Sequence, residues 1–464
     1  MNAETLSYRS HLAVPAADVF RWHARPGALE RLTPPWEPVQ VLERTGDGIT
    51  DGTRVTLGIR LGPLRCRWVS EHRAYCQDAQ FCDVQIAGPF ARWEHTHRFI
   101  PDGASASYLE DHITYALPLG VVTQLGARAL VRRKLDRLFA YRHRVTKHDL
   151  TIHRAYRENK PLHVLVTGAS GLLGAALVPF LTTGGHRVTR LVRSAPRPGQ
   201  AEIAWQPETG TIATSALAGV EAVVHLAGEN IATGRWTAEK KARIRASRVE
   251  GTRLLCQALA QLEHPPHVLV SASAIGYYGN RGAEVLHEDS APGSGFLAEV
   301  CQAWEAATAP ALQRGIRVVP LRFGMVLSPA GGALAQMLLP FKLGAGGVIG
   351  SGQQSMSWIA LDDAIGAILH AIMTPSVQGP VNAVAPQALT NREFTTWLGH
   401  VLRRPTWLPL PAAAVRLAFG EIAEALLLAS ARVEPRRLLD TGYVFGYPDL
   451  DSTLRHLLGK PHVA

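Results

Sequence analysis

Apolar residues follow two kinds of pattern along the chain, and the pattern changes near residue 160. Before that point, segments such as 54–59, 65–72 and 107–116 alternate apolar and polar residues, which predicts antiparallel strands with one buried face. A long helix is expected over 124–146, where apolar residues recur at helical spacing. Beyond residue 160, short continuous apolar runs indicate the fully buried strands of a parallel sheet.

The clearest element of the second half is a glycine-rich turn between an apolar strand and an apolar helix, with a second strand after them. Such a strand, turn, helix and strand form a βαβ unit with a right-handed crossover. The spacing G-x-x-G-x-x-G allows a tight turn, close approach of a pyrophosphate and close packing of helix on strand. Phosphates would meet free N–H groups at the helix start. The candidate cofactor-binding residues of this loop are Gly168, Ala169, Ser170, Gly171, Leu172, Leu173 and Gly174.

The end of the second strand bears on which nicotinamide nucleotide would bind. NAD sites place an acidic residue there for the ribose 2′-hydroxyl, whereas an arginine accommodates the 2′-phosphate of NADP. The chain has Arg193 at this position and no carboxylate, with Arg197 close behind. We therefore predict NADP (NADPH) as the cofactor, while a solvated strand-end charge is the alternative interpretation of Arg193.

Three further buried strands are expected at 220–228, 268–273 and 317–323. Ligands of open α/β sheets bind at the carboxyl ends of the strands, so Leu226 and Ala227 should pass beside the cofactor. Ser273 should reach the same edge.

Length and composition divide the chain. Its 464 residues suggest about three domains. We predict an α+β domain over 1–150, a linker over 151–161, a nucleotide-binding domain over 162–385 and a mainly helical cap over 386–464.

The net charge of +10 raises the question of a nucleic-acid partner. Basic residues gather in helix-like stretches at 128–147 and 235–253, which we interpret as solvated faces and phosphate-binding arginines, and no nucleic acid is expected. No apolar run reaches membrane length and residues 1–10 lack signal-peptide features. Five irregularly spaced cysteines do not suit a disulfide framework, so a cytoplasmic location is expected.

Three histidines of the first domain are candidate metal ligands: His95, His97 and His112. His95 and His97 alternate along one predicted strand and so share a face. Because the sequence does not place a carboxylate that would orient these rings, we predict histidines satisfied by their neighbours and no metal.

The motifs TGASGLLG, VVHLAG, SASAIGYYG, LRFGMVL and WIALDDAIGAI resemble, in order, those of extended short-chain dehydrogenase/reductases. HLAGENI, RWTAEKKARIRASR and MLLPFKLGAGGVIGSGQQSMSWI resemble the atypical "epimerase family" subgroup, which ends in a domain of unknown function. The resemblance implies a doubly wound Rossmann sheet and adds Arg243, Arg248 and Val326 to the NADP contacts. The first 150 residues resemble START-like (SRPBCC) helix-grip domains, which implies either a cavity for a hydrophobic ligand or a filled, supporting domain.

Catalytic members of the superfamily use Ser, Tyr and Lys, the last two spaced Y-x-x-x-K. The corresponding helix here reads Phe296-Leu297-Ala298-Glu299-Val300, so both phenol and ammonium are missing. Ser273 and Tyr278 are the candidate catalytic residues, with Tyr277, Glu288 and Glu305 as alternative proton carriers. Two hypotheses stay open: an NADP-dependent oxidoreductase or epimerase-like enzyme on an unknown carbonyl or hydroxyl substrate, and a non-catalytic NADP-responsive binding protein.

Overall fold

The computed structural model describes residues 3–46, 48–61, 64–118 and 121–461. The chain forms two compact units, one chiefly from residues 1–159 and the other chiefly from 160–458. The predicted cap region 386–464 contributes mostly to the second unit.

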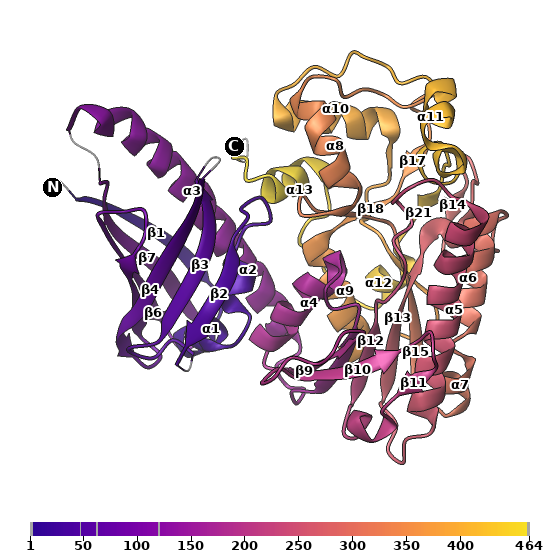
Figure 1. Ribbon diagram of the computed structural model, residues 1–464, viewed down its shortest axis with the longest axis horizontal. Coiled ribbons are helices and arrows are strands. Elements are labelled where there is room, and N and C mark those ends of the chain that lie inside the picture. The colour runs from indigo at the N-terminus through magenta and orange to yellow at the C-terminus, as the bar shows by residue number, and fades with distance from the viewer. Residues whose placement is uncertain (1–2, 47, 62–63, 119–120, 462–464) are drawn as a thin grey trace. The chain divides into compact units, whose positions relative to one another are not determined.

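The first unit is an antiparallel sheet with a long helix (Figure 1). Its strands lie in the order β1-β7-β6-β5-β4-β3-β2. They are β1 (Glu4–Leu12), β2 (Gln40–Thr45), β3 (Arg54–Leu61), β4 (Leu64–Cys76), β5 (Gln80–Ala87), β6 (Arg92–Asp102) and β7 (Ala106–Ala116). The helices are α1 (Ala16–Ala24), α2 (Ala28–Leu32) and α3 (Val121–Ala155). Burial alternates strictly along most of β7, as the sequence pattern predicts.

The long helix packs its apolar side on the sheet. Leu135 and Phe139 join Trp93, Ile113 and Tyr115 in one core cluster. The helix is longer than predicted and takes up residues 151–155, which we expected to be linker. The reason is burial: Leu150 and Ile152 lie in the interior, so the last turns are held by packing that a local pattern does not reveal.

The second unit is a doubly wound sheet in the order β11-β10-β9-β8-β12-β13-β15-β19. All neighbours pair in parallel except β10 with β11. The strands are β8 (His163–Thr167), β9 (Arg187–Val192), β10 (Glu202–Gln206), β11 (Thr211–Ile212), β12 (Ala222–His225), β13 (Val268–Ala274), β15 (Arg317–Phe323) and β19 (Val381–Ala383). The chain order reverses between β8 and β12, the switch point where ligands bind in such sheets. The predicted Rossmann architecture is confirmed.

Helices cover both faces of this sheet. In Figure 1, α5 (Ala238–Ala260) and α6 (Phe296–Ala306) lie on one side, and α4 (Leu172–Thr183) and α9 (Leu361–Met373) on the other. The smaller elements are η1 (Thr214–Leu217), η2 (Ile275–Tyr278), β14 (Val285–Leu286), α7 (Ala309–Gln313), β16 (Met325–Leu327), α8 (Gly332–Lys342), β17 (Ser355–Met356) and β18 (Trp358–Ala360).

The C-terminal region is helical with irregular connections. It comprises β20 (Leu389–Thr390), α10 (Asn391–Leu402), α11 (Ala412–Phe419), η3 (Ala423–Leu427), β21 (Arg432–Val433), α12 (Arg436–Asp440) and α13 (Leu450–Leu457). A capping box between Thr390 and Glu393 begins α10. Side chains of α8, α10 and α13 share one core cluster. Among the described helices, none is long and apolar enough to cross a membrane.

Candidate nucleotide site and the adjoining polar network

The glycine loop between β8 and α4 is built for close approach. Gly168 has φ +67°, and a Cβ there would lie 2.7 Å from the carbonyl carbon of Leu226. At Gly174 a Cβ would stand 2.3 Å from the Gly168 carbonyl oxygen. Side chains at these two positions would therefore break the turn or push α4 away from β8. Gly171 is exposed, and Leu172 and Leu173 open α4.

The exit of β12 is tied to the end of β8. The Thr167 hydroxyl accepts hydrogen bonds from the backbone N–H groups of Leu226 (3.1 Å) and Ala227 (3.2 Å). His225 contacts the same hydroxyl at 2.7 Å. The structure thus brings Leu226 and Ala227 against Gly168 of the glycine loop, which lies 58 and 59 residues before them in the sequence.

Basic side chains gather around Glu229, just beyond β12. Lys240 donates to its carboxylate at 2.7 Å, and Arg243 Nε lies 3.8 Å from it. The hydrogen bond from Lys240 lowers the pKa of Glu229, and the charges of Arg243 and Arg193 lower it further. Arg193 directly follows β9 and is exposed. The positive charges of Lys240, Arg243 and Arg193 therefore all act on the Glu229 carboxylate, at the switch point of the sheet.

Arg248 reaches this place from the middle of α5. Its guanidinium donates to the Glu229 carbonyl oxygen at 3.0 Å and lies 5.0 Å from the ring centroid of Trp304. Burial lowers the pKa of Arg248. It also lies against Gly228, where a Cβ would come within 3.3 Å of the guanidinium carbon. The arginine is thus rigidly placed, as a planar anion partner must be.

Val326 lies on β16, close to the start of α4. A Cβ at Gly332 would meet the Val326 carbonyl oxygen at 3.6 Å and the Leu172 side chain at 3.4 Å. Val326 and Leu172, both predicted cofactor residues, therefore lie near each other on either side of Gly332.

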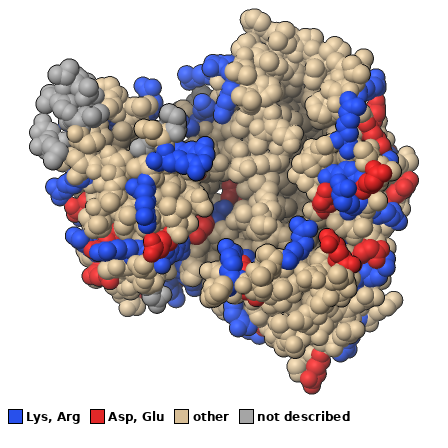
Figure 2. Space-filling view, viewed as in Figure 1, with Lys and Arg blue, Asp and Glu red and all other residues tan. Residues whose placement is uncertain are grey.

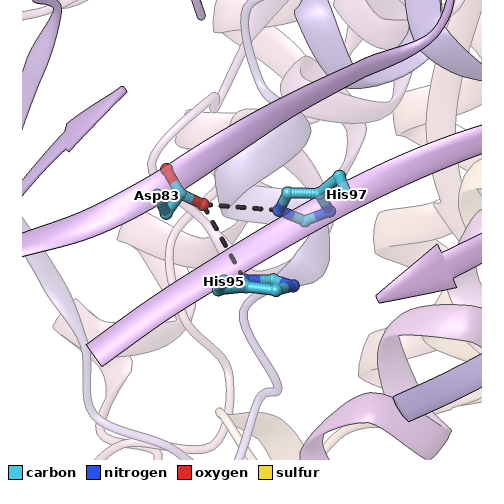
Figure 3. Close-up of side chains that lie close together, drawn as sticks. All are labelled: Asp83, His95 and His97. Atoms are coloured by element: carbon cyan, nitrogen blue, oxygen red, sulfur yellow. Dashed lines mark hydrogen bonds and ion pairs between the residues drawn. The ribbon is translucent and has the colours of Figure 1, made fainter. Parts of the chain in front are cut away.

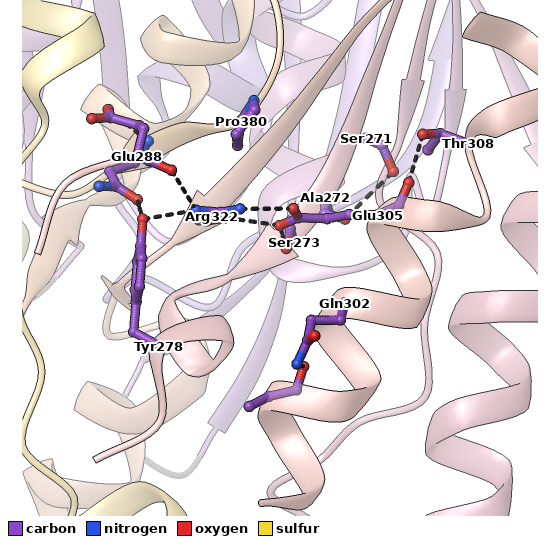
Figure 4. A network of polar contacts seen from close by, with 12 residues as sticks. Ser271, Ala272, Ser273, Tyr278, Glu288, Gln302, Glu305, Thr308, Arg322 and Pro380 are labelled. Atoms are coloured by element: carbon purple, nitrogen blue, oxygen red, sulfur yellow. Dashed lines mark hydrogen bonds and ion pairs between the residues drawn. The ribbon is translucent and has the colours of Figure 1, made fainter. Parts of the chain in front are cut away.

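A buried polar network fills the carboxyl end of β13 and β15 (Figure 4). The Ser273 hydroxyl donates to Glu305 Oε1 at 2.6 Å. Arg322, with a side chain only 3% exposed, donates to both oxygens of that carboxylate at 2.9 Å. Burial acts to lower the pKa of Arg322, but the bonds to Glu305 outweigh it and raise that pKa. This bidentate pair holds Glu305 in one geometry beside Ser273.

Tyr278 lies at the other end of this network and is 0% exposed. Its hydroxyl contacts Asn382 Oδ1 at 2.7 Å and the His287 carbonyl oxygen at 2.9 Å, and accepts from Arg322 at 2.9 Å. Burial raises the pKa of Tyr278, against the effect of Arg322. We expected this hydroxyl to face a ligand at the sheet edge, and that expectation is wrong. The hydroxyl points into the interior, because the ring packs against Leu286, Val384 and Val433.

Tyr277 is the partly exposed phenol of the pair. The guanidinium carbon of Arg322 lies 3.5 Å from its ring centroid, a cation–π contact. Glu288, by contrast, is 3% exposed, and its Oε1 accepts from the backbone N–H groups of Asn382 and Arg437, both at 3.1 Å. Those bonds make Glu288 a structural acceptor, while Glu305 keeps a side chain that is 15% exposed.

Comparison with known proteins gives the relationship of the whole chain. Residues 164–384 match the NAD dependent epimerase/dehydratase family, and 410–457 match a domain of unknown function, DUF1731. An epimerase family protein of Mycobacterium bovis is 45% identical over 298 residues, which are 64% of this chain and 98% of the relative. The chain belongs to the epimerase family.

Two solved structures extend the comparison. A nucleoside-diphosphate sugar epimerase of Corynebacterium glutamicum is 33% identical, with a TM-score of 0.79 over 98% of this chain and 90% of that chain. A human epimerase family protein (isoform 2), solved with NADPH, is 37% identical, with a TM-score of 0.58 over 64% of this chain and 99% of that chain. Residues 12–139 match the polyketide cyclase / dehydrase and lipid transport family. The predicted resemblance is confirmed for each part of the chain.

Sequence reasoning missed three residues of the candidate site and its polar network: Glu229, Arg322 and Asn382. Arg322 carried a signal, because this arginine stands within the apolar part of the strand Arg317–Phe323, unlike Arg317 at the strand's start. A charge in such a strand needs a buried partner, and Glu305 is that partner. Glu229 and Asn382 follow or lie within ordinary strands and had no comparable signal.

On the face drawn in Figure 2, the basic side chains do not form one continuous positive patch. On the face shown in Figure 2, Asp and Glu side chains lie among the Lys and Arg side chains. On α5, Arg253 pairs with Glu250 at 2.8 Å, and Lys241 pairs with Glu421 at 2.9 Å. This distribution agrees with the interpretation of solvated faces; the predicted lack of a nucleic-acid partner stays a prediction.

Proposed function

We propose that this epimerase family chain binds NADP(H) at the Gly168–Gly174 loop and acts as an oxidoreductase or epimerase-like enzyme on a small carbonyl or hydroxyl substrate. The observation that carries the proposal is the group of cations at the switch point: Arg193, Lys240, Arg243 and Arg248 around Glu229. A 2′-phosphate placed there would meet guanidinium groups suited to bidentate contacts.

The glycine loop fits a pyrophosphate. Gly168 and Gly174 let the loop backbone pack closely against Leu226 and against the start of α4. The first N–H groups of an α-helix have no partner within the helix, so a phosphate placed at the start of α4 would meet such donors. Leu226 and Ala227 border the loop on the β12 side. The bound nucleotide would supply hydride chemistry, and the chain's own residues would hold and orient the substrate.

Ser273 is the first catalytic candidate, because its hydroxyl stands at the carboxyl end of β13. Its proton points to Glu305, so Ser273 and Glu305 form a pair able to pass a proton. Arg322 is a positioning residue that holds the carboxylate. Tyr277 replaces Tyr278 as the candidate phenol, since it is partly exposed and lies under the fixed charge of Arg322. Tyr278 serves to anchor the network.

One observation favours the second candidate, a non-catalytic NADP-responsive binding protein. By the resemblance, α6 corresponds to the helix that carries Y-x-x-x-K in catalytic members of the superfamily; here it begins Phe296-Leu297-Ala298-Glu299-Val300, and Tyr278 is buried. In that case the first unit would bind a hydrophobic ligand, as its match to a lipid-transport family suggests.

Calorimetry with NADPH and NADH tests the nucleotide site. We expect NADPH to bind more tightly, and Arg193→Ala to weaken NADPH binding by roughly 10- to 100-fold, the loss of one charged hydrogen-bonded contact. NADH binding should change little. Arg253→Ala is the matched control, an exposed arginine paired on α5 with Glu250. Equal affinity for both nucleotides in the wild type would overturn the assignment of NADP.

Turnover separates the two functions. A screen of NADPH oxidation against quinones, aldehydes and sugar-nucleotide ketones should identify a substrate, and Tyr277→Phe should then lower kcat by roughly 10²- to 10⁴-fold. Nucleotide affinity should stay unchanged in that variant. Tight NADPH binding with no turnover across the screen would favour the binding protein.

A further inference from the structure

The interior of the first unit contains a cluster of imidazoles and carboxylates, drawn from neighbouring strands (Figure 3). The strand register creates it: Asp83 of β5 stands opposite His95 of β6, and His97 of β6 stands opposite Asp111 of β7. His95 and His97 are buried on the same face of β6, as their alternation predicts, whereas His112 faces the other side of β7.

Three of these side chains converge on one point. Asp83 Oδ2 lies 3.3 Å from His97 Nε2 and 3.8 Å from His95 Nδ1. One possible ligand atom from each of Asp83, His95 and His97 lies within 4.8 Å of the others. Around a tetrahedral ion with metal–ligand bonds of roughly 2.0–2.2 Å, adjacent ligand atoms stand about 3.3 Å apart. The two separations from Asp83 Oδ2, 3.3 and 3.8 Å, are close to that value.

A second layer of contacts orients the outer face of the same rings. His95 Nε2 lies 2.9 Å from Asp111 Oδ1, which leaves Nδ1 directed toward Asp83. The other oxygen of Asp111 contacts His143 Nε2 at 2.7 Å, and His143 Nδ1 contacts Ser10 Oγ at 2.7 Å. Metal-binding histidines typically engage a carboxylate through the second nitrogen in this way.

His97 is oriented in a related manner. Its Nδ1 lies 2.7 Å from Asp111 Oδ1, although not in line for a hydrogen bond, and its Nε2 faces Asp83. The ring stacks on Phe81 with centroids 4.3 Å apart, and Phe139 stands edge-on to His95 at 5.1 Å. Aromatic neighbours thus limit rotation of both imidazoles.

Access comes from the Asp83 side. The His95 side chain is 3% exposed and that of Asp83 is 23% exposed. His72, on β4, contacts the other Asp83 oxygen, Oδ1, at 2.7 Å. An ion could therefore enter past Asp83, and a coordination position would stay open on that side.

We propose that Asp83, His95 and His97 bind a divalent first-row transition-metal ion, with Asp111 and His143 as positioning residues. Two imidazoles and one carboxylate suit Zn²⁺ or Fe²⁺ and leave positions for water or a ligand. As predicted, neighbouring side chains satisfy both histidines; the proposal differs from the sequence-based expectation only in adding a metal ion. The missing carboxylate was Asp111, which the strand register supplies.

Cobalt(II) is the probe for the test, because its visible absorption reports coordination by nitrogen and oxygen. The full chain, without an affinity tag, is dialysed against a chelator and titrated with Co²⁺, and bound metal is counted by elemental analysis. We expect saturation at about one ion per chain and proton release on binding. His97→Gln and, separately, Asp83→Asn should abolish the absorption.

The matched control is His112→Gln, a histidine on the opposite face of β7, which should bind like the wild type. Asp111→Asn should weaken Co²⁺ binding by roughly 10- to 100-fold while keeping the stoichiometry. If His97→Gln does not fold, Asp83→Asn and the wild-type titration decide. A wild type that binds no Co²⁺, or binding unchanged in Asp83→Asn, would overturn the proposal and leave a purely hydrogen-bonded cluster.

Discussion

The network around Arg322 in the second unit and the cluster around Asp111 in the first are both buried and charged, but they are built from different chemistry. In the second unit, Arg322 grips Glu305 with two hydrogen bonds and also contacts the Tyr278 hydroxyl. In the first unit, carboxylates are surrounded by imidazoles, as Asp111 is by His95 and His143. A guanidinium has only donors and stays charged, so it fixes geometry. An imidazole keeps a nitrogen that can take a proton or a metal.

The difference between guanidinium and imidazole groups indicates different roles for the two buried clusters. The network around Arg322 is a scaffold that holds Ser273 and Glu305 at the sheet edge. The cluster around Asp83 is a set of potential metal ligands. It lies in the unit that matches the polyketide cyclase / dehydrase and lipid transport family. Burial alone does not distinguish these roles; the donor and acceptor inventory of each side chain does.

Removing the fixed charge should have the largest effect. Arg322→Leu is expected to lower the free energy of unfolding by about 3–5 kcal/mol, because it leaves the Glu305 carboxylate without its counter-charge and removes one donor from the Tyr278 hydroxyl. Urea denaturation followed by tryptophan fluorescence measures it. Arg253→Leu, which breaks only an exposed pair on α5, should cost less than about 1 kcal/mol. An equal loss of unfolding free energy in the two variants would show that the Arg322 network stabilises the fold no more than an exposed ion pair does.

In the first unit, Asp111→Asn should cost about 1.5–3 kcal/mol, the usual loss for a hydrogen bond to a charged group. The next residue is a control: Glu110→Gln breaks the pair with Arg98 at 3.2 Å on the opposite face. That change should cost about 0–1 kcal/mol. If both variants lose the same stability in denaturant titrations of the chelator-treated chain, the interior cluster is no more important than the surface pair.

Acid should weaken the second unit through His225. Burial lowers the pKa of His225 to about 4, so the folded chain keeps this imidazole neutral. The contribution of this neutral imidazole to stability is fully present above the unfolded-state pKa of about 6.5. It is lost as the pH drops toward 4, so the free energy of unfolding should fall by about 2 kcal/mol between pH 7 and pH 5. Unfolding midpoints at the two pH values measure it. His225→Gln should reduce the dependence without abolishing it, because burial also lowers the pKa of His370 to about 4, and an unchanged slope would rule His225 out as a source.

The smallest effect is expected at Ser273. Ser273→Ala should cost only about 1 kcal/mol of stability, because Glu305 keeps both bonds to Arg322. Turnover of any substrate found should fall much further. A thermal melt and a rate measurement on the same preparation separate the two quantities. A large loss of stability with unchanged kcat would make Ser273 structural.

The sequence by itself determined the local elements of the nucleotide site. Gly168 and Gly174 were predicted because a turn with positive φ and a close strand–helix contact depend on residues a few positions apart. The parallel sheet was predicted from its apolar runs. Arg193 was singled out by its position after β9; its role in binding a 2′-phosphate stays a prediction.

Only the tertiary structure decided which side chains meet across long distances in sequence. Tyr278 was placed at the sheet edge by its position after β13, but packing turned its hydroxyl toward Asn382, which lies 104 residues away. Likewise, His95 and His97 were visible as a pair, whereas Asp83 and Asp111 join them only through the register of three strands. Register depends on the burial of whole strands, which no local pattern around a histidine contains.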